Sequence, residues 1–302
     1  MDFDMHYLAV VFNSTIRMLT PILYVTLGSA LCNRVFIFNI GLEGTMLTGA
    51  FVAIVINYYT GSAAASLLGA MIASMLISLI AGIFMVRFKG AMLVVGVSIN
   101  VLMGGLTTFF MQYIFGVKGA VVSDRLVGLT KVDVSWLKGM PTLQTMFGSL
   151  TYIDYFAFVL AVLIYIFLFK TVWGFRLRSV GINISAAKSL GIKAEQIQIA
   201  TVAFSGVLSG IGGCLLTMGG VTMFAQNITA GRGFIAMAAA SLGAAHPLGC
   251  IVSSAFFGFA QSISNMLQNS QISNELTMAI PYAATIIALA IYNYIGIKRE
   301  KN

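Results

Sequence analysis

Apolar runs as long as a membrane is thick dominate the chain. A helix needs about 20 residues to cross the hydrocarbon core of a bilayer, and runs of this length follow one another through the sequence. Hydrophobic residues make up 59% of the chain and charged residues 9%, whereas soluble domains carry about 25% charged residues. Because the runs are continuous and do not alternate with polar residues, they disfavour an outer-membrane barrel. The sequence therefore predicts an all-α, polytopic membrane protein.

The apolar runs predict nine membrane segments, of which the second and the seventh are short. The ninth contains Pro281, which is expected to kink it or to be absorbed by neighbouring helices. The nine segments are Tyr7–Leu31, Leu42–Tyr59, Ala63–Val86, Ala91–Phe115, Tyr152–Val172, Ile197–Met218, Gly233–Ala245, Leu248–Leu267 and Leu276–Ile297.

The distribution of basic residues orients these segments. Cytoplasmic loops of membrane proteins carry an excess of Lys and Arg. With the N-terminus outside and the C-terminus inside, the inner connections hold eleven basic residues and the short outer connections hold none. Four more lie in the outer loop at 117–150, whose length weakens the rule. The net charge of +8 is thus explained by topology, and no nucleic-acid partner is expected.

The predicted segments divide into two halves of opposite topology. The first repeat spans about 8–116 and the second about 197–297, with a crossover segment at 152–172. Each half has, at its second segment, a charged residue among glycines before a short helix of small side chains: Glu43 in the first half and Arg232 in the second. Such paired interruptions in inverted repeats indicate a translocation site. By this symmetry, Glu43 and Arg232 are expected on opposite sides of the membrane.

Glu43 is a carboxylate inside an apolar run. Burying a charge is costly, so it needs a polar partner, a water-filled cavity or a proton. A helix starting near Gly44 leaves free N–H groups, which Asn39 and Glu43 are expected to cap. If capping is its role, Glu43→Gln should keep most of the function and Glu43→Ala should lose it. The other interpretation is that Glu43 and Arg232 contact the solute.

Neutral polar residues recur at a spacing of four in the fourth and eighth segments, and therefore share one helix face. Such faces either hydrogen-bond to other helices or line a path. The polar faces of these two segments, with Phe109 and Phe110 nearby, would suit a neutral, hydrogen-bonding, partly flat solute. The candidate path residues are Asn39, Glu43, Asn100, Thr108, Gln112, Arg232, Gln261 and Asn265.

Several distinctive residues are expected to be structural. Asp154 is predicted to be a helix N-terminal acid, and His246 a turn residue. The three cysteines lie in separate apolar runs and are interpreted as small buried residues. A small-residue stripe in the sixth segment predicts close helix packing: Ala203, Gly206, Gly210 and Gly213.

The inner loop at 173–196 is basic and contains a short helix-like piece, Ser185–Leu190, between Gly181 and Gly191. One interpretation is an interfacial helix held by anionic lipid. The other is a knob that docks on a cytoplasmic partner. The sequence contains no GxxxxGK[ST], HExxH, GxSxG or CxxC motif, so neither ATP hydrolysis nor other enzymatic chemistry is expected of this chain. No cofactor and no metal are expected either.

Three stretches carry a resemblance to a known family: FNIGLEGTMLTGAF, VGINISAAKSLGI and GRGFIAMAAASLGAAHPLG. In this order they resemble permease subunits of bacterial binding-protein-dependent ABC importers, in the branch that serves branched-chain amino acids, simple sugars and nucleosides. The resemblance covers about Val11 to Ile295, and the NIGLEG form is most similar to the shorter permease of nucleoside importers. The chain departs from the pattern at Ala244–His246, where bulkier or charged residues are expected.

The resemblance implies a single permease domain over residues 1–302 in the bacterial cytoplasmic (inner) membrane. That domain would form the path for a small neutral solute, a nucleoside first and a simple sugar or riboflavin-like ring compound second. The glycine-flanked elements at 41–44 and 231–233 would be broken helices near the path. A stand-alone secondary carrier or channel is the competing class.

The resemblance also implies partners. These are ATPase subunits that bind ATP, a second permease subunit that is homologous or identical, an extracytoplasmic solute-binding lipoprotein or periplasmic protein, and membrane lipid. The inner loop would couple the permease to the ATPase. Its implied coupling residues are Gly181, Ser185, Ala186, Ala187, Lys188 and Gly191.

Overall fold

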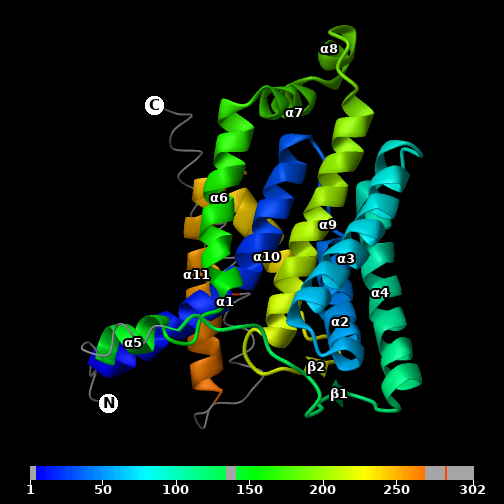
Figure 1. Ribbon diagram of the computed structural model, residues 1–302. Helices are drawn as coiled ribbons and strands as arrows, with labels where there is room; N and C mark the ends of the chain where they lie inside the picture. The colour runs from blue at the N-terminus through cyan, green and yellow to red at the C-terminus, as the bar shows by residue number, and fades with distance from the viewer. Residues whose placement is uncertain (1–4, 134–140, 269–282, 284–302) are drawn as a thin grey trace.

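The computed structural model describes residues 5–133, 141–268 and 283, and is mostly helical (Figure 1). The ninth predicted segment lies outside the described residues, apart from residue 283. The helices are α1 (Met5–Arg34), α2 (Leu42–Thr60), α3 (Ala63–Val86), α4 (Met92–Phe115), α5 (Pro141–Phe147), α6 (Tyr152–Lys170), α7 (Val172–Ile182), α8 (Ile184–Ser189), α9 (Ala194–Met218), α10 (Arg232–Leu242) and α11 (Pro247–Leu267). Two short strands accompany them, β1 (Ala120–Val121) and β2 (Phe224–Ala225).

Every predicted segment within the described residues coincides with a helix, which confirms the predicted helical class. Six of the described helices, α1, α3, α4, α6, α9 and α11, are long and apolar enough to cross a membrane. The second and seventh segments are α2, with 19 residues, and α10, with 11. The count of nine crossings, the repeats and the orientation of the termini stay predictions.

Helix α9 lies at the centre of the bundle and packs against α1, α2 and α3. The predicted small-residue stripe makes these contacts close. A Cβ atom on Gly206 would lie 2.4 Å from Ser78 Oγ, one on Gly210 would lie 2.5 Å from Ala70 O, and one on Gly213 would lie 2.1 Å from Met46 O. The packing role predicted for the stripe is confirmed.

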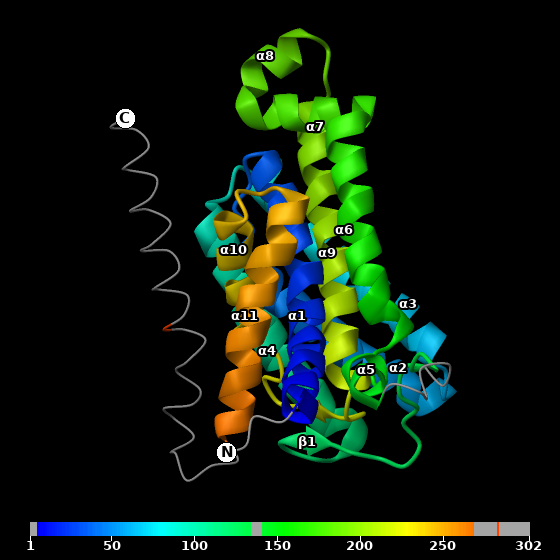
Figure 2. The ribbon, with the colours of Figure 1, turned by 90° about the vertical axis from the view of Figure 1, so that its left-hand side faces the viewer.

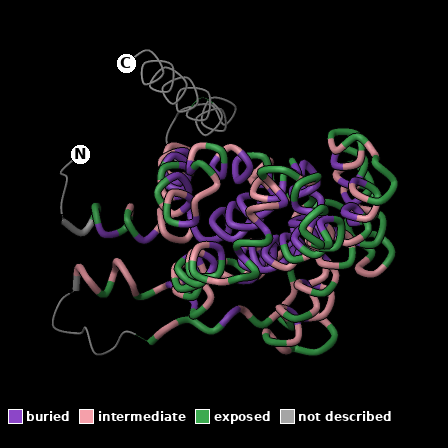
Figure 3. The backbone as a smooth tube through the Cα atoms, turned by 90° about the horizontal axis from the view of Figure 1, so that it is seen from above, coloured by how far each residue is buried: buried purple, intermediate pink, exposed green. Residues whose placement is uncertain are grey.

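Burial follows the arrangement expected of a bundle in lipid. Viewed from above, the buried residues gather at the centre and the exposed ones lie around the rim (Figure 3). The rim is apolar: on α3, large side chains at a spacing of four are exposed, namely Leu68, Ile72, Leu76 and Ile80. Because α3 is also among the helices apolar enough to span a membrane, this face suits lipid or a partner helix and not water.

The residues predicted to be structural have those roles. Asp154 is in the first turn of α6 and forms a capping box with Thr151, and its carboxylate also accepts a hydrogen bond from Thr20 on α1. His246 precedes α11, in the turn after α10, and its ring packs against Tyr165 and Phe169. The three cysteines are buried and free: Cys32, Cys214 and Cys250.

The loops between the long helices hold structure that the sequence did not reveal. Strands β1 and β2 pair antiparallel, with Ala120 opposite Ala225, at the end of the bundle opposite α7 and α8 (Figures 1 and 2). They join the loop after α4 to the loop after α9. Each strand has two residues, which is too short for a period-2 pattern to be recognised.

Candidate translocation site and coupling loop

The buried side-chain amide of Asn39 stabilises the irregular segment before α2. Residues 37–39 are without regular structure, and Phe36 just before them adopts a φ of 60°. The Asn39 side chain accepts a hydrogen bond from the Gly41 N–H (3.2 Å) and donates one to Ser205 Oγ on α9 (3.2 Å). Since an unpaired backbone group is costly in an apolar environment, these bonds allow the interruption to exist inside the bundle.

The first turn of α2 is capped from another helix. Asn100, on α4, accepts a hydrogen bond from the Gly44 N–H (2.8 Å) and donates one to Ile40 O (3.0 Å). The prediction that Asn39 helps to cap this region agrees with its bond to Gly41. The prediction that Glu43 caps its own helix is wrong, because its side chain is directed to α10 instead.

Glu43 holds the N-terminus of α10. Its Oε1 accepts a hydrogen bond from the Gly231 N–H (2.8 Å) and its Oε2 accepts one from the Gly233 N–H (2.6 Å). The side chain is buried, with 8% of its surface exposed. Gly231 adopts a φ of 79°, and a Cβ atom on Gly233 would lie 2.6 Å from Glu43 Cα. Both glycines are therefore needed for this approach.

Two helix N-termini stabilise the same carboxylate. Glu43 belongs to the first turn of α2 and binds the first N–H groups of α10. The N-terminus of a helix carries about half a positive charge and favours anions, by about 0.3–1 kcal/mol when exposed and up to ~2 kcal/mol when partly buried. The hydrogen bonds and the two helix dipoles together offset the cost of burying the charge.

The expectation that Glu43 and Arg232 lie on opposite sides of the membrane is wrong. The carboxylate binds the residues on both sides of Arg232 in sequence, so the two interrupted segments meet at one point. Arg232 Nη1 donates to Ile228 O (2.9 Å) and Thr229 O (3.3 Å) in the loop that leads into α10. Both interruptions lie inside the bundle, where the Glu43 carboxylate reaches the N-terminus of α10, and so they do not lie at opposite surfaces.

The structure does not gather the remaining candidate path residues at this point. Thr108 donates to Gly104 O of its own helix (2.8 Å), and Gln112 is exposed. Gln261 and Asn265, on α11, form a hydrogen bond with each other (Gln261 Nε2 to Asn265 Oδ1, 3.2 Å). The residues that do come together are Asn39, Glu43, Asn100 and the backbone around Arg232.

The loop at 173–196 folds as two short helices, α7 and α8, with a small core of their own. Ala187, on α8, is buried with Val180 of α7 and Ala194 of α9. Asn183 caps α8 by accepting a hydrogen bond from the Ala186 N–H (3.0 Å). The predicted helix Ser185–Leu190 thus agrees with α8 to within one residue at each end.

The two glycines that flank α8 have separate physical roles. A Cβ atom on Gly181 would lie 2.0 Å from Arg34 O at the end of α1, so α7 can contact α1 only with glycine there. Gly191 adopts a φ of 76°, a backbone conformation that favours glycine. Arg34 also donates to Ala245 O (2.9 Å) and Ala244 O (3.2 Å). It therefore joins α7 to the turn after α10, where the sequence departs from the family pattern.

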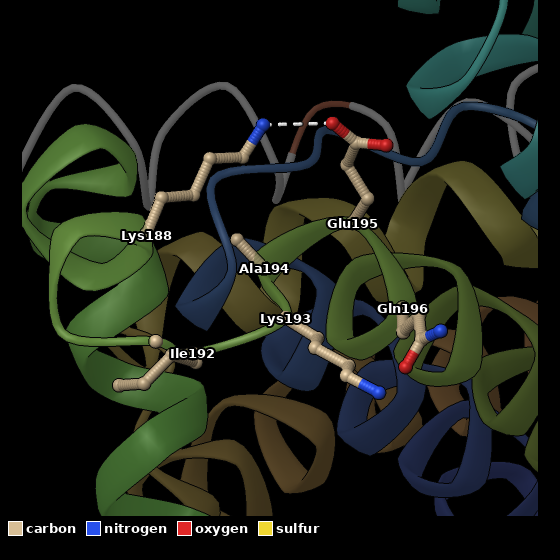
Figure 4. Close-up of a pocket in the computed structure, with 7 residues that line it drawn as sticks. Lys188, Ile192, Lys193, Ala194, Glu195 and Gln196 are labelled. Atoms are coloured by element: carbon tan, nitrogen blue, oxygen red, sulfur yellow. Dashed lines mark hydrogen bonds and ion pairs between the residues drawn. The ribbon is translucent and has the colours of Figure 1, made fainter.

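An ion pair closes the loop onto α9. Lys188 Nζ lies 2.7 Å from Glu195 Oε1 (Figure 4), beside a shallow cavity of about 350 Å³. Both side chains are about half exposed, 50% for Lys188 and 55% for Glu195, and exposed ion pairs of this kind contribute little to stability. Ser185, Ala186 and Lys188 are exposed around it.

Sequence reasoning missed three residues that hold these elements in place. Glu195 follows Lys188 by seven residues, which is too far for a pattern within one helix. Gln198 donates to Val35 O (3.0 Å) and Ser205 receives the Asn39 bond. Both lie on α9, and the only available signal was their polar character within an apolar run.

These features are those of a multi-pass membrane protein: a helical bundle in which two interrupted segments meet, with a folded loop at one end. The chain belongs to the family described as branched-chain amino acid transport system / permease component, whose model matches residues 11–289.

Relatives of known name span almost the whole chain. The guanosine ABC transporter permease protein NupQ of Bacillus subtilis is 35% identical over 93% of this chain and 91% of its own. The nucleoside ABC transporter permease protein NupC of Lactococcus lactis is 33% identical over 90% of this chain and 89% of its own. A solved metal-chelate type ABC transporter in an inward-facing conformation covers 92% of this chain and 85% of its own, with a TM-score of 0.50 and 14% identity, which supports the fold alone.

Proposed function

We propose that this chain is the membrane-spanning permease subunit of an ABC importer and forms the path for a nucleoside. The observation that carries the proposal is the whole-length similarity to two permeases named for guanosine and nucleoside transport. On this proposal, residues 1–302 are one permease domain in the cytoplasmic membrane, built from two inverted repeats.

The meeting point of α2 and α10 supports a neutral solute. The Glu43 carboxylate is already bound by two backbone N–H groups, so it is not available as a counter-ion for a cationic solute. Two neutral polar side chains, Asn39 and Asn100, bind the backbone at the start of α2, the helix that carries Glu43. We place the solute path beside this point, with Gln261 and Asn265 farther along it. Thr108, Gln112 and Arg232 stay candidates for the same path.

The partners follow from the class of importer. ATPase subunits bind and hydrolyse ATP, an extracytoplasmic protein delivers the solute, and a second permease, homologous or identical, completes the path. The α7–α8 loop would meet the ATPase. Ile182, the last residue of α7, and Leu190, directly after α8, support this, because these large apolar side chains are 86% and 80% exposed, as expected of a surface that binds a partner.

Reconstitution in liposomes tests the function. Uptake of labelled guanosine is expected only when this chain is combined with the partner permease, the ATPase, ATP and the binding protein. Excess unlabelled nucleoside should compete, and a simple sugar or riboflavin should not. Competition by the sugar or riboflavin would change the substrate class, whereas uptake by this chain alone would establish a stand-alone carrier or channel.

Thiol labelling tests the proposed orientation, in which the loop at 117–150 is outside and α8 is inside. Thr130→Cys should react with an impermeant maleimide added to intact cells, and Ser189→Cys should react only after the cells are opened. Both positions are exposed, and the three native cysteines are buried, so the wild-type chain is the matched background. The reverse pattern would invert the topology.

Single substitutions in α8 test its docking role. Ala186→Asp places a charge on the exposed face and should leave the protein folded, while the ATPase no longer co-purifies, because burying an unpaired charge at an interface is strongly unfavourable. Ala187→Asp should instead unfold the loop, since Ala187 is buried within it. The two residues therefore must be tested separately. Normal ATPase co-purification and uptake with Ala186→Asp would favour the other interpretation, in which α8 is an interfacial helix held by anionic lipid.

A further inference from the structure

An apolar cavity of about 1120 Å³ lies between α6 and α9, below α7. Helices α6 and α9 both pack against α1, which contributes Leu31 to the cavity lining. Helix α7 runs across the ends of α6 and α9 (Figure 1). The cavity is larger than the roughly 300–1,000 Å³ of ordinary small-molecule pockets. Its walls are formed mainly by large apolar side chains: Leu160, Leu163, Ile164, Phe167, Ile197 and Phe204.

The polar groups of this cavity gather at its α7 end, apart from Thr201, whose hydroxyl donates to Ile197 O of its own helix. Arg176, Lys193 and Gln196 line it there, together with Trp173. The Arg176 guanidinium lies over the Trp173 ring, 5.3 Å from its centre, which holds both side chains at the rim. Among the described residues that line the cavity, none is acidic.

The nearest acid in the sequence, Glu195, is paired with Lys188. Figure 4 shows the Lys193 side chain directed away from this pair, toward Gln196. The positive charges of Arg176 and Lys193 thus face the rim of the cavity with no internal counter-ion among its lining residues.

We infer that the cavity binds an anionic phospholipid, with its phosphate between Arg176 and Lys193 and an acyl chain between α6 and α9. Apolar walls below two cations and an exposed tryptophan match the order of groups in a lipid, from tail to headgroup. Basic pockets between membrane helices on the cytoplasmic side bind anionic headgroups. The proposed orientation places this lipid in the inner leaflet.

The charge at the rim favours lipid over a second protein chain as the occupant. A partner helix would have to bring its own acidic residues to balance Arg176 and Lys193 at the membrane surface, whereas an anionic leaflet supplies that charge directly. The bound lipid would fill the space between α6 and α9 and would support α7 from below. The surface that docks the ATPase would then depend on the lipid composition of the membrane.

The test measures lipid retention by the purified importer in neutral detergent, using native mass spectrometry and thermal denaturation. Phosphatidylglycerol should bind and raise the Tm, and phosphatidylcholine should do so much less. Replacing both cations, Arg176→Gln with Lys193→Gln, should weaken phosphatidylglycerol binding roughly 30-fold, as expected for two basic residues at a membrane surface. The matched control, Arg87→Gln with Lys89→Gln, removes two exposed cations outside the cavity and should change binding little.

A second variant fills the apolar part of the site. Ala200 lines the cavity and is exposed, so Ala200→Trp should reduce the binding of both lipids without changing the charge. This variant keeps the inference testable if the double substitution prevents folding.

Three outcomes would overturn the inference. The first is equal binding of the two lipids. The second is an equal Tm rise with water-soluble glycerol phosphate, which would indicate a free-anion site. The third is an efficient cross-link from Leu163→Cys to the second permease, which would show that protein covers this face.

Discussion

Glu43→Gln is expected to reduce solute uptake by at least about tenfold, because both carboxylate oxygens accept hydrogen bonds from backbone N–H groups. A carboxamide has one acceptor oxygen, so its NH₂ group would face an N–H of Gly231 or Gly233. A buried donor left without a partner costs about 1–3 kcal/mol, and the loss of the charge removes the interaction with two helix N-termini. This result differs from the expectation for a helix-capping Glu43, in which Gln keeps most of the function, because the carboxylate binds two N–H groups of α10.

Uptake and the thermal stability of the detergent-purified protein are the measurements for Glu43. Glu43→Ala should be worse than Gln in both, since it removes both acceptors. Asp124→Asn is the matched control, because it makes the same acid-to-amide change at an exposed carboxyl and should leave stability nearly unchanged. Wild-type uptake by Glu43→Ala would show that the contact with α10 is dispensable.

Gly213→Ala is expected to destabilise the bundle although it adds a single methyl group. The new Cβ would lie 2.1 Å from Met46 O and 2.6 Å from Ala50 N. Both are backbone atoms of α2, so relief requires that α2 and α9 move apart. Overpacking of this kind costs about 1–3 kcal/mol, and occasionally more. The same movement would disturb Glu43, one turn before Met46, so uptake should fall together with the Tm.

Gly105→Ala is the control for this substitution. Gly105 also lies within a membrane helix, α4, but a Cβ atom there would meet nothing within 4 Å. Glycine in a helix interior is about 0.5–1 kcal/mol less favourable than alanine, so the control should be neutral or slightly stabilising. An unchanged Tm with Gly213→Ala would mean that α2 and α9 are packed less closely than described.

The helices could be predicted from the sequence because lipid imposes a simple rule. Backbone groups without water must pair within their own segment, so continuous apolar runs such as Ala63–Val86 are helices from end to end. The same rule identified the two interruptions, because a glycine and a charged residue inside such a run need polar partners for the backbone and for the charge. The short helix α8 was visible because glycines and polar residues flank it.

The contacts of the candidate site could not be predicted in the same way. Glu43 is separated from Gly231 by 188 positions, and no periodicity within a helix indicates which distant N–H group a carboxylate will reach. Asn100 shows the same limit: its spacing placed it on a polar face, but its partner is the start of α2. Symmetry suggested where the interruptions lie in each half but not how deeply they enter the bundle.

The contacts of Arg34 give the molecule a mechanical linkage. Gly181 packs against the carbonyl oxygen of Arg34. The guanidinium of Arg34 donates hydrogen bonds to the carbonyl oxygens of Ala244 and Ala245. These two residues follow α10, whose opposite end is held by Glu43. On the proposed docking of α8 to the ATPase, we expect a displacement of α8 to pass through the end of α1 to α10, whose N-terminus is bound by Glu43. Because α10 has only 11 residues, we expect it to move as one unit about its contact with Glu43, so that the displacement would reach the point where α2 and α10 meet.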